Sequence, residues 1–152
     1  MKLAEALMLR GDMQKKLASL RERVAQNAVV QDGETPHEDP NQLLEEAVSL
    51  LRELEGLVFK INQANLASKL PDGRSLTEAI ARRDTLIQQH SLVQAAIAAT
   101  HKEPERYSVR EIKWVATLDV QKLQRQSEDL SKKIRELNGR IQETNWKIEL
   151  DA

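Results

Sequence analysis

The chain has 152 residues, of which 31% are charged and 3% are aromatic, a composition that suits long helices packed through narrow seams. Its formal net charge of −1 gives no electrostatic reason to expect nucleic acid or an anionic membrane as a partner. The absence of cysteine excludes disulfides, thiolate catalysis and cysteine-ligated zinc or iron–sulfur sites.

The first predicted helix covers residues about 2–30. Apolar side chains recur mostly three or four residues apart from Leu3 to Val24, and the outer face is mainly basic. Glu5 interrupts the early apolar run and Arg10 ends it, so we expect an amphipathic helix and not a signal peptide. No stretch approaches the roughly 20 apolar residues that span a bilayer. We therefore expect a cytoplasmic protein without a membrane partner.

The second predicted helix covers residues 40–67. Asp39 is placed to accept the unpaired backbone N–H groups of its first turn, and Pro40 suits the first helical position. Spacings of three and four predict a coiled-coil seam made by Leu44, Ala47, Leu51, Leu54, Val58, Ile61 and Asn65. Its early surface is acidic, and pairing with the basic first helix predicts an antiparallel hairpin.

Two further helices are predicted over residues 76–100 and 120–149. Pro71, Asp72 and Gly73 form a turn, and Ser75 with Glu78 is a capping-box signature. The expected seam of the third helix is Leu76, Ala79 or Ile80, Arg83, Leu86, His90, Val93 and Ile97. Asp119 is expected to cap the fourth helix, whose seam is Val120, Leu123, Ser127, Leu130, Ile134, Leu137, Ile141, Thr144 and Ile148.

The segment between these helices alternates in polarity and is rich in β-branched residues, which is typical of a strand. We expect a small β element at residues 109–117 that could pair near residues 68–75, or an extended crossover, at one end of the bundle. The alternative is a helical start at Val109 that continues into the fourth helix. The predicted fold is mostly α: one helical domain over residues 1–152, built as an elongated up-down antiparallel four-helix bundle with coiled-coil packing, with the β element at one end.

Several stretches, "MKLAEALMLRGDMQKKLASLRERV", "INQAN", "LPDGRSLTEAIARRD", "RYSVREIKWVATLDV" and "LNGRIQETNW", give the chain a family likeness. The chain resembles a septicolysin-like family of small bacterial helical proteins over nearly its whole length. The resemblance implies an intracellular helical protein and, by the family name, a membrane-acting cytolysin. It supplies no catalytic residues.

Polar residues at predicted seam or end positions are the candidates for a site. Asn65 lies on a seam, where a buried amide fixes register or lines a polar pocket. Arg83 and His90 lie seven residues apart, so Arg83 forms an interhelical salt bridge or binds an anion beside His90 as acid or base. The expected ligand pocket comprises Asn62, Asn65, Arg83, Asp84, Arg106, Tyr107 and Glu111. Asn145 and Trp146 are expected to plug the bundle end or to lie at an interface.

These observations favour a non-enzymatic helical scaffold or interaction protein that self-associates as a homodimer or a larger closed ring. A slender bundle exposes long apolar edges, which a second copy or an unidentified protein partner would cover. The alternative is a small-ligand-binding protein or an enzyme with a polar pocket at the β-capped end. The sequence contains no phosphate loop, nucleophile elbow, dinucleotide motif or helical metal-ligand pair, so we expect no cofactor and no metal.

Overall fold

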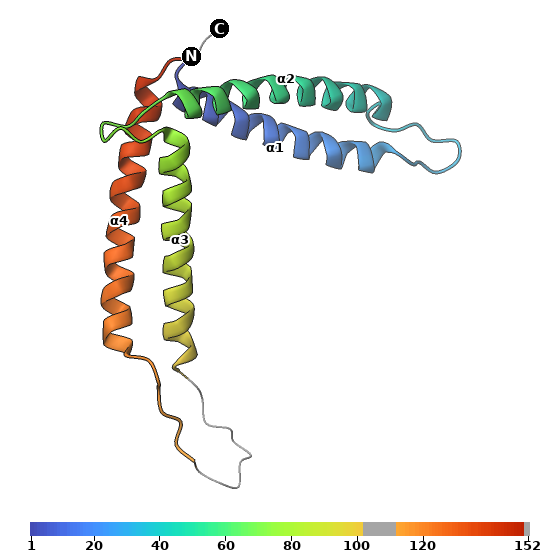
Figure 1. Cartoon of the computed structure of the whole chain (residues 1–152). Helices are drawn as coiled ribbons and strands as arrows, with labels where there is room; N and C mark the ends of the chain where they lie inside the picture. Colours follow the sequence, from blue (N-terminus) through green and yellow to red (C-terminus); the bar gives the residue numbers. More distant parts are fainter. Residues whose placement is uncertain (102–111, 151–152) are drawn as a thin grey trace. The chain divides into compact units, whose positions relative to one another are not determined.

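The computed structural model describes residues 1–101 and 112–150 and contains four long α-helices (Figure 1). The helices are α1 (Leu3–Asn27), α2 (Pro40–Ala67), α3 (Leu76–Ala99) and α4 (Val120–Lys147). The expectation of four helices is confirmed. The chain divides into two compact units, Met1–Lys69 with Gln142–Ala152 (unit 1) and Leu70–Ile141 (unit 2). The expectation of one domain over the whole chain is not tested by this division and stays a prediction.

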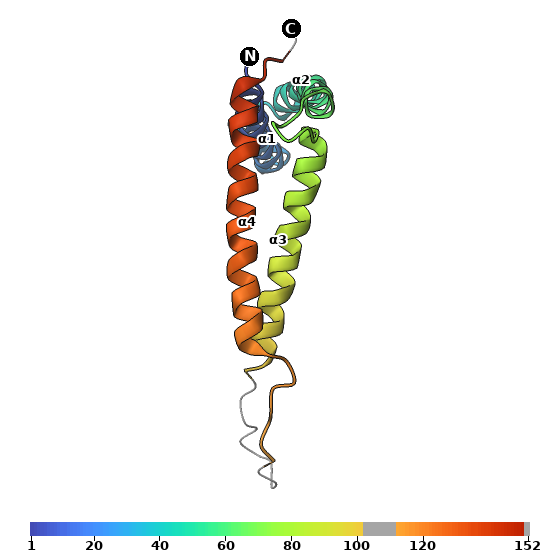
Figure 2. The same ribbon diagram turned by 60° about the vertical axis from the view of Figure 1, so that its left-hand side comes forward.

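Unit 1 is built on α1 and α2, which lie side by side and antiparallel (Figures 1 and 2). Met13 and Leu20 of α1 are buried with Leu43 and Leu50 of α2 in one apolar cluster. The predicted pairing of a basic with an acidic helix is observed, because the Lys16 ammonium lies 2.9 Å from a carboxylate oxygen of Glu46 on α2. Such an exposed pair adds little stability, so packing holds the hairpin and charge supports its register.

Side-chain caps start α2 and α3 at the predicted positions. A carboxylate oxygen of Asp39 accepts the backbone N–H of Asn41 at 2.9 Å. The hydroxyl of Ser75 accepts the backbone N–H of Glu78 at 3.1 Å. Both bonds satisfy backbone donors that a helix N-terminus otherwise leaves unpaired.

The buried face of α2 differs from the predicted seam by one position along half of its length. Leu43 and Leu50 are buried, whereas Leu44 and Leu51 are exposed. The physical reason is that α2 carries two neighbouring apolar stripes with the same three-four spacing, and α1 covers only one of them. The second stripe faces outward along α2.

Unit 2 is a second antiparallel pair formed by α3 and α4 (Figure 2). Leu86 and Val93 of α3 and Leu130 and Leu137 of α4 are buried. All four lie on the seams predicted for these helices. In α3 and α4, unlike α2, each helix has one dominant apolar stripe. The spacing of the apolar residues in the sequence therefore identified the buried face correctly.

The predicted β element is wrong. Residues 112–118 contain no strand, and the only β pairing in the described part of the chain consists of single-residue bridges. The proposed pairing partner closes its own turn instead, with the Leu70 N–H donating to the Arg74 carbonyl at 2.8 Å and Gly73 at a φ of 89°. The alternative helical start also fails over 112–119, since α4 begins at Val120. Residues 109–111 lie outside the described residues.

The last turn of α4 belongs to unit 1, where it meets the start of α1. The backbone N–H of Leu3 donates to the carbonyl of Ile148 at 2.9 Å, and that of Leu150 donates to the carbonyl of Met1 at 2.8 Å. The ammonium of Lys2 lies 2.6 Å from a carboxylate oxygen of Glu149. These contacts lower the pKa of Glu149, chiefly through the hydrogen bond from Lys2.

Adjacent leucines on α2 provide a matched test of its buried face. Leu50 is 8% exposed and Leu51 is 53% exposed. We expect Leu50→Ala to lower the free energy of unfolding by about 2–5 kcal/mol, because it leaves a cavity in the α1–α2 cluster. At protein concentrations too low for assembly, Leu51→Ala should change it by no more than about 0.5 kcal/mol. Urea unfolding followed by circular dichroism measures both, and a larger loss for Leu51→Ala would contradict the observed packing.

The ion pair between Arg23 and Glu38 predicts a specific acid response. The Arg23 Nε donates to a carboxylate oxygen of Glu38 at 2.9 Å, and this bond holds the pKa of Glu38 below its ordinary value of 4.5. A carboxyl group with a lowered folded-state pKa stabilises above its unfolded pKa and loses that effect as pH falls through the folded value. Glu38→Gln should therefore be less stable than the wild type at pH 7. The difference should vanish on acidification below pH 4.5, in unfolding curves recorded across that range.

Candidate functional site

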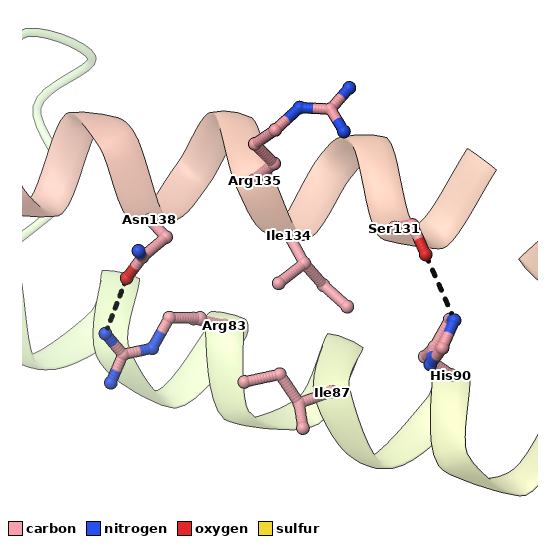
Figure 3. A pocket seen from close by; sticks show the side chains of 7 residues that line it. All are labelled: Arg83, Ile87, His90, Ser131, Ile134, Arg135 and Asn138. Carbon is pink, nitrogen blue, oxygen red and sulfur yellow. Dashed lines mark hydrogen bonds between the residues drawn. The ribbon is translucent and has the colours of Figure 1, made fainter. Parts of the chain in front are cut away.

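An open groove runs between α3 and α4 on one face of unit 2, with a volume of about 630 Å³ (Figure 3). Two isoleucines form its apolar part, Ile87 from α3 and Ile134 from α4. Polar side chains of both helices surround them. The α3–α4 groove is lined by Arg83, Ile87, His90, Ser131, Ile134, Arg135 and Asn138.

Arg83 spans the two helices at one end of the groove. Its Nη1 donates to the side-chain oxygen of Asn138 at 3.0 Å (Figure 3). Its Nε is buried and makes no hydrogen bond within the described residues, and the nearest carboxylate, that of Asp84, lies 3.6 Å away. Across the helix pair, Arg83 thus contacts the side-chain amide of Asn138 and no carboxylate. Its positive charge is opposed only by Asp84, the next residue on α3.

His90 occupies the other end, between two hydroxyl groups of α4. Its Nε2 lies 3.0 Å from the Ser131 Oγ and 3.2 Å from the Ser127 Oγ. The Gln94 amide also donates to the Ser127 hydroxyl, at 2.5 Å. Two side chains of α3, His90 and Gln94, thus share the buried Ser127.

A serine beside a histidine also occurs in nucleophilic catalysis, where a third group orients the histidine. No carboxylate in the described part of the chain forms a hydrogen bond with His90. The arrangement therefore fits a hydrogen-bonded seam better than a catalytic triad. Among the described residues, no group of three or more His, Asp or Glu side chains is placed to hold a metal ion.

The predicted pocket residues fall on separate elements. Asn62 is exposed and Asn65 is half-buried on α2 in unit 1, whereas Arg83 and Asp84 lie together on α3 in unit 2. The remaining members, Arg106, Tyr107 and Glu111, lie outside the described residues. Convergence of the full set stays a prediction.

The predicted interface residues differ in exposure. Asn145 is buried, and its Oδ1 accepts no hydrogen bond from the described residues. Trp146 is exposed. Their role at an interface stays a prediction.

Four groove residues were missed in the sequence, namely Ile87, Ser131, Arg135 and Asn138. They lie beside the seam positions and not on them, so heptad spacing alone does not select them. The available signal was the presence of polar seam residues on both helices. In an antiparallel pair, His90 on one helix and Ser127 on the other predict a polar layer and draw attention to its neighbours.

The sequence matches the model of a family of unknown function, DUF6847, over residues 10–150, and the chain belongs to that family. This finding overturns the predicted septicolysin-like membership, which no comparison supports. A crystal structure of a functionally unknown conserved protein from Corynebacterium diphtheriae is similar, with 33% sequence identity, 99% of each chain covered and a TM-score of 0.92. No curated protein matches the chain.

The shared serine gives a test of the groove's hydrogen bonds. Ser127→Ala removes the acceptor of Gln94 and one partner of His90. We expect a loss of about 1–2 kcal/mol in the free energy of unfolding, because Ser127 is buried and its removal ends two hydrogen bonds between α3 and α4. Ser131→Ala is the control, since Ser131 is exposed and its loss leaves His90 beside Ser127; it should cost about 0.5 kcal/mol or less. Urea unfolding measures both variants. Equal losses in the free energy of unfolding for Ser127→Ala and Ser131→Ala would contradict the different roles assigned to the two serines.

Proposed function

We propose that the protein is a non-enzymatic helical scaffold that self-associates through the outward face of α2. One observation carries this proposal. A row of large apolar side chains on α2 is at least 39% exposed. This outer stripe comprises Leu44, Val48, Leu51, Phe59 and Leu66.

The outer stripe differs from the scattered apolar residues found on most protein surfaces. Its members recur at intervals of three, four, seven or eight residues, which places them on one side of a helix. From Leu44 to Leu66 the stripe is about 33 Å long at a rise of 1.5 Å per residue. Isolated exposed apolar side chains need no explanation, whereas several along one side of a helix typically mark an interaction surface.

A small-ligand-binding protein or an enzyme remains the second proposal, and the α3–α4 groove is the observation that favours it. The groove presents two arginines, an amide, a histidine and a hydroxyl beside two isoleucines. Its polar groups, however, largely bond to one another across the seam, which favours a structural role for them. The cytolysin reading rested on the overturned resemblance, and no described helix is both long enough and apolar enough to cross a membrane.

Native mass spectrometry and sedimentation velocity over a range of concentrations test self-association. A discrete oligomer is the expected result. Leu51→Ser should weaken association about tenfold or more, because a leucine side chain contributes at least about 1.5 kcal/mol when fully buried.

Leu92→Ser is the matched control, since Leu92 is an exposed leucine on α3 outside the outer stripe, and it should leave association unchanged. A wild-type monomer at every concentration would overturn self-association. Retention of a small molecule by that monomer would favour the ligand-binding alternative.

A further inference from the structure

The α3–α4 groove combines apolar surface with incompletely neutralised positive charge. Ile87 is 46% exposed beside Ile134, so the groove offers packing surface to a further helix. Arg135 is exposed at the groove and forms no ion pair or hydrogen bond with the described residues. Arg83 adds a second guanidinium, and only Asp84 forms an ion pair with it.

The outer stripe of α2 has the complementary chemistry. Glu55 lies within it, four residues after Leu51 and four before Phe59, on the same side of the helix. It is exposed and forms no ion pair with the described residues. A carboxylate therefore stands unpaired in the middle of an apolar row. The net charges of the two units are opposite in the same sense. Acidic residues outnumber basic ones in unit 1, and basic residues outnumber acidic ones in unit 2.

We propose that the α3–α4 groove of one copy binds the outer stripe of α2 from a second copy, with Glu55 directed to Arg135. The inference rests on the proposed self-association and identifies its two surfaces. Packing of α2 over α3 and α4 would bury Ile87 and Ile134 against the outer stripe and pair two charges that the chain leaves unpaired. Charge complementarity of this kind selects partner and register.

Pairing of two outer stripes with each other is less favourable. Glu55 lies midway between Leu44 and Leu66, so a two-fold axis that gives the stripes full overlap would place the two Glu55 carboxylates opposite each other. Such like-charge contacts are unfavourable. Binding of the outer stripe in the α3–α4 groove avoids this repulsion. Because this contact joins two different surfaces of the chain head to tail, it generates a closed ring or an open chain of copies.

Charge reversal in full-length chains tests the pairing. Glu55→Arg and Arg135→Glu should each weaken self-association about tenfold or more, because each places like charges in contact. An equimolar mixture of the two variants should assemble again, since every stripe then meets a groove of opposite charge. Sedimentation velocity measures assembly, and circular dichroism verifies that each variant is folded.

Glu53→Arg and Lys132→Glu are the matched controls, because both residues are exposed on the same helices and lie outside the outer stripe and the groove. They should assemble as the wild type does. Reversals at 55 and 135 that leave assembly unchanged, or a mixture that fails to assemble, overturn the inference while self-association stands. A monomeric wild type overturns both.

Crosslinking gives a second readout that needs no change in affinity. The chain contains no cysteine, so Glu55→Cys in one preparation and Arg135→Cys in another introduce one thiol each. A short bis-maleimide reagent added to the mixture should link the two variants to each other, and Lys132→Cys should react little in place of Arg135→Cys. Equal crosslinking at positions 132 and 135, or none in a wild-type-like oligomer, overturns the stripe-to-groove contact.

Discussion

The structure depends on the packing of helices in antiparallel pairs, each with one buried seam. In such a pair, each helix covers only the stripe of its partner that faces it. All remaining apolar positions of the partner stay exposed on its outer face. On α2 this constraint has a visible consequence. Leu43 and Leu50 pack against α1, while the neighbouring leucines at 44 and 51 stay exposed. The apolar outer face of α2 is thus exposed because the hairpin has only one partner helix for α2, and not because α1 and α2 pack poorly.

The two pairs use their seams differently. The α1–α2 cluster is apolar, with charges such as Lys16 and Glu46 at its edge. The α3–α4 seam interleaves buried leucines with Arg83, His90 and Ser127. An apolar seam tolerates a shift of one helix along the other better than a polar one, because a shifted polar layer leaves donors and acceptors unpaired. Unit 2 therefore has its register specified by hydrogen bonds.

The sequence predicted the helices well because their starts are chemically marked. Asp39 before Pro40 and Ser75 before Glu78 are caps that act locally, and both appear as hydrogen bonds. The face of α2 was harder to predict because both of its stripes have the spacing of a seam. Only the position of α1 decides between them, and that is tertiary information.

The strand prediction failed for a related reason. Alternating polarity at 112–118 describes side chains, whereas a strand also needs a partner for its backbone groups. The segment expected to pair closes a turn on itself through Leu70 and Arg74. The groove was partly predictable: Arg83 and His90 stood out as polar residues on an apolar seam. Asn138 and Ser131 did not, because their role depends on which residues of α4 lie opposite.

This dependence links the fold of unit 2 to any use of its groove. The bonds from Arg83 to Asn138 and from His90 to Ser127 hold α3 and α4 in one register. That register determines that Ile87 and Ile134 line the same groove. A slip of one residue along either helix would rotate one isoleucine away by about 100°. These polar residues would thus control binding in a second way, beside any contact they make themselves, because they determine where the apolar binding surface lies.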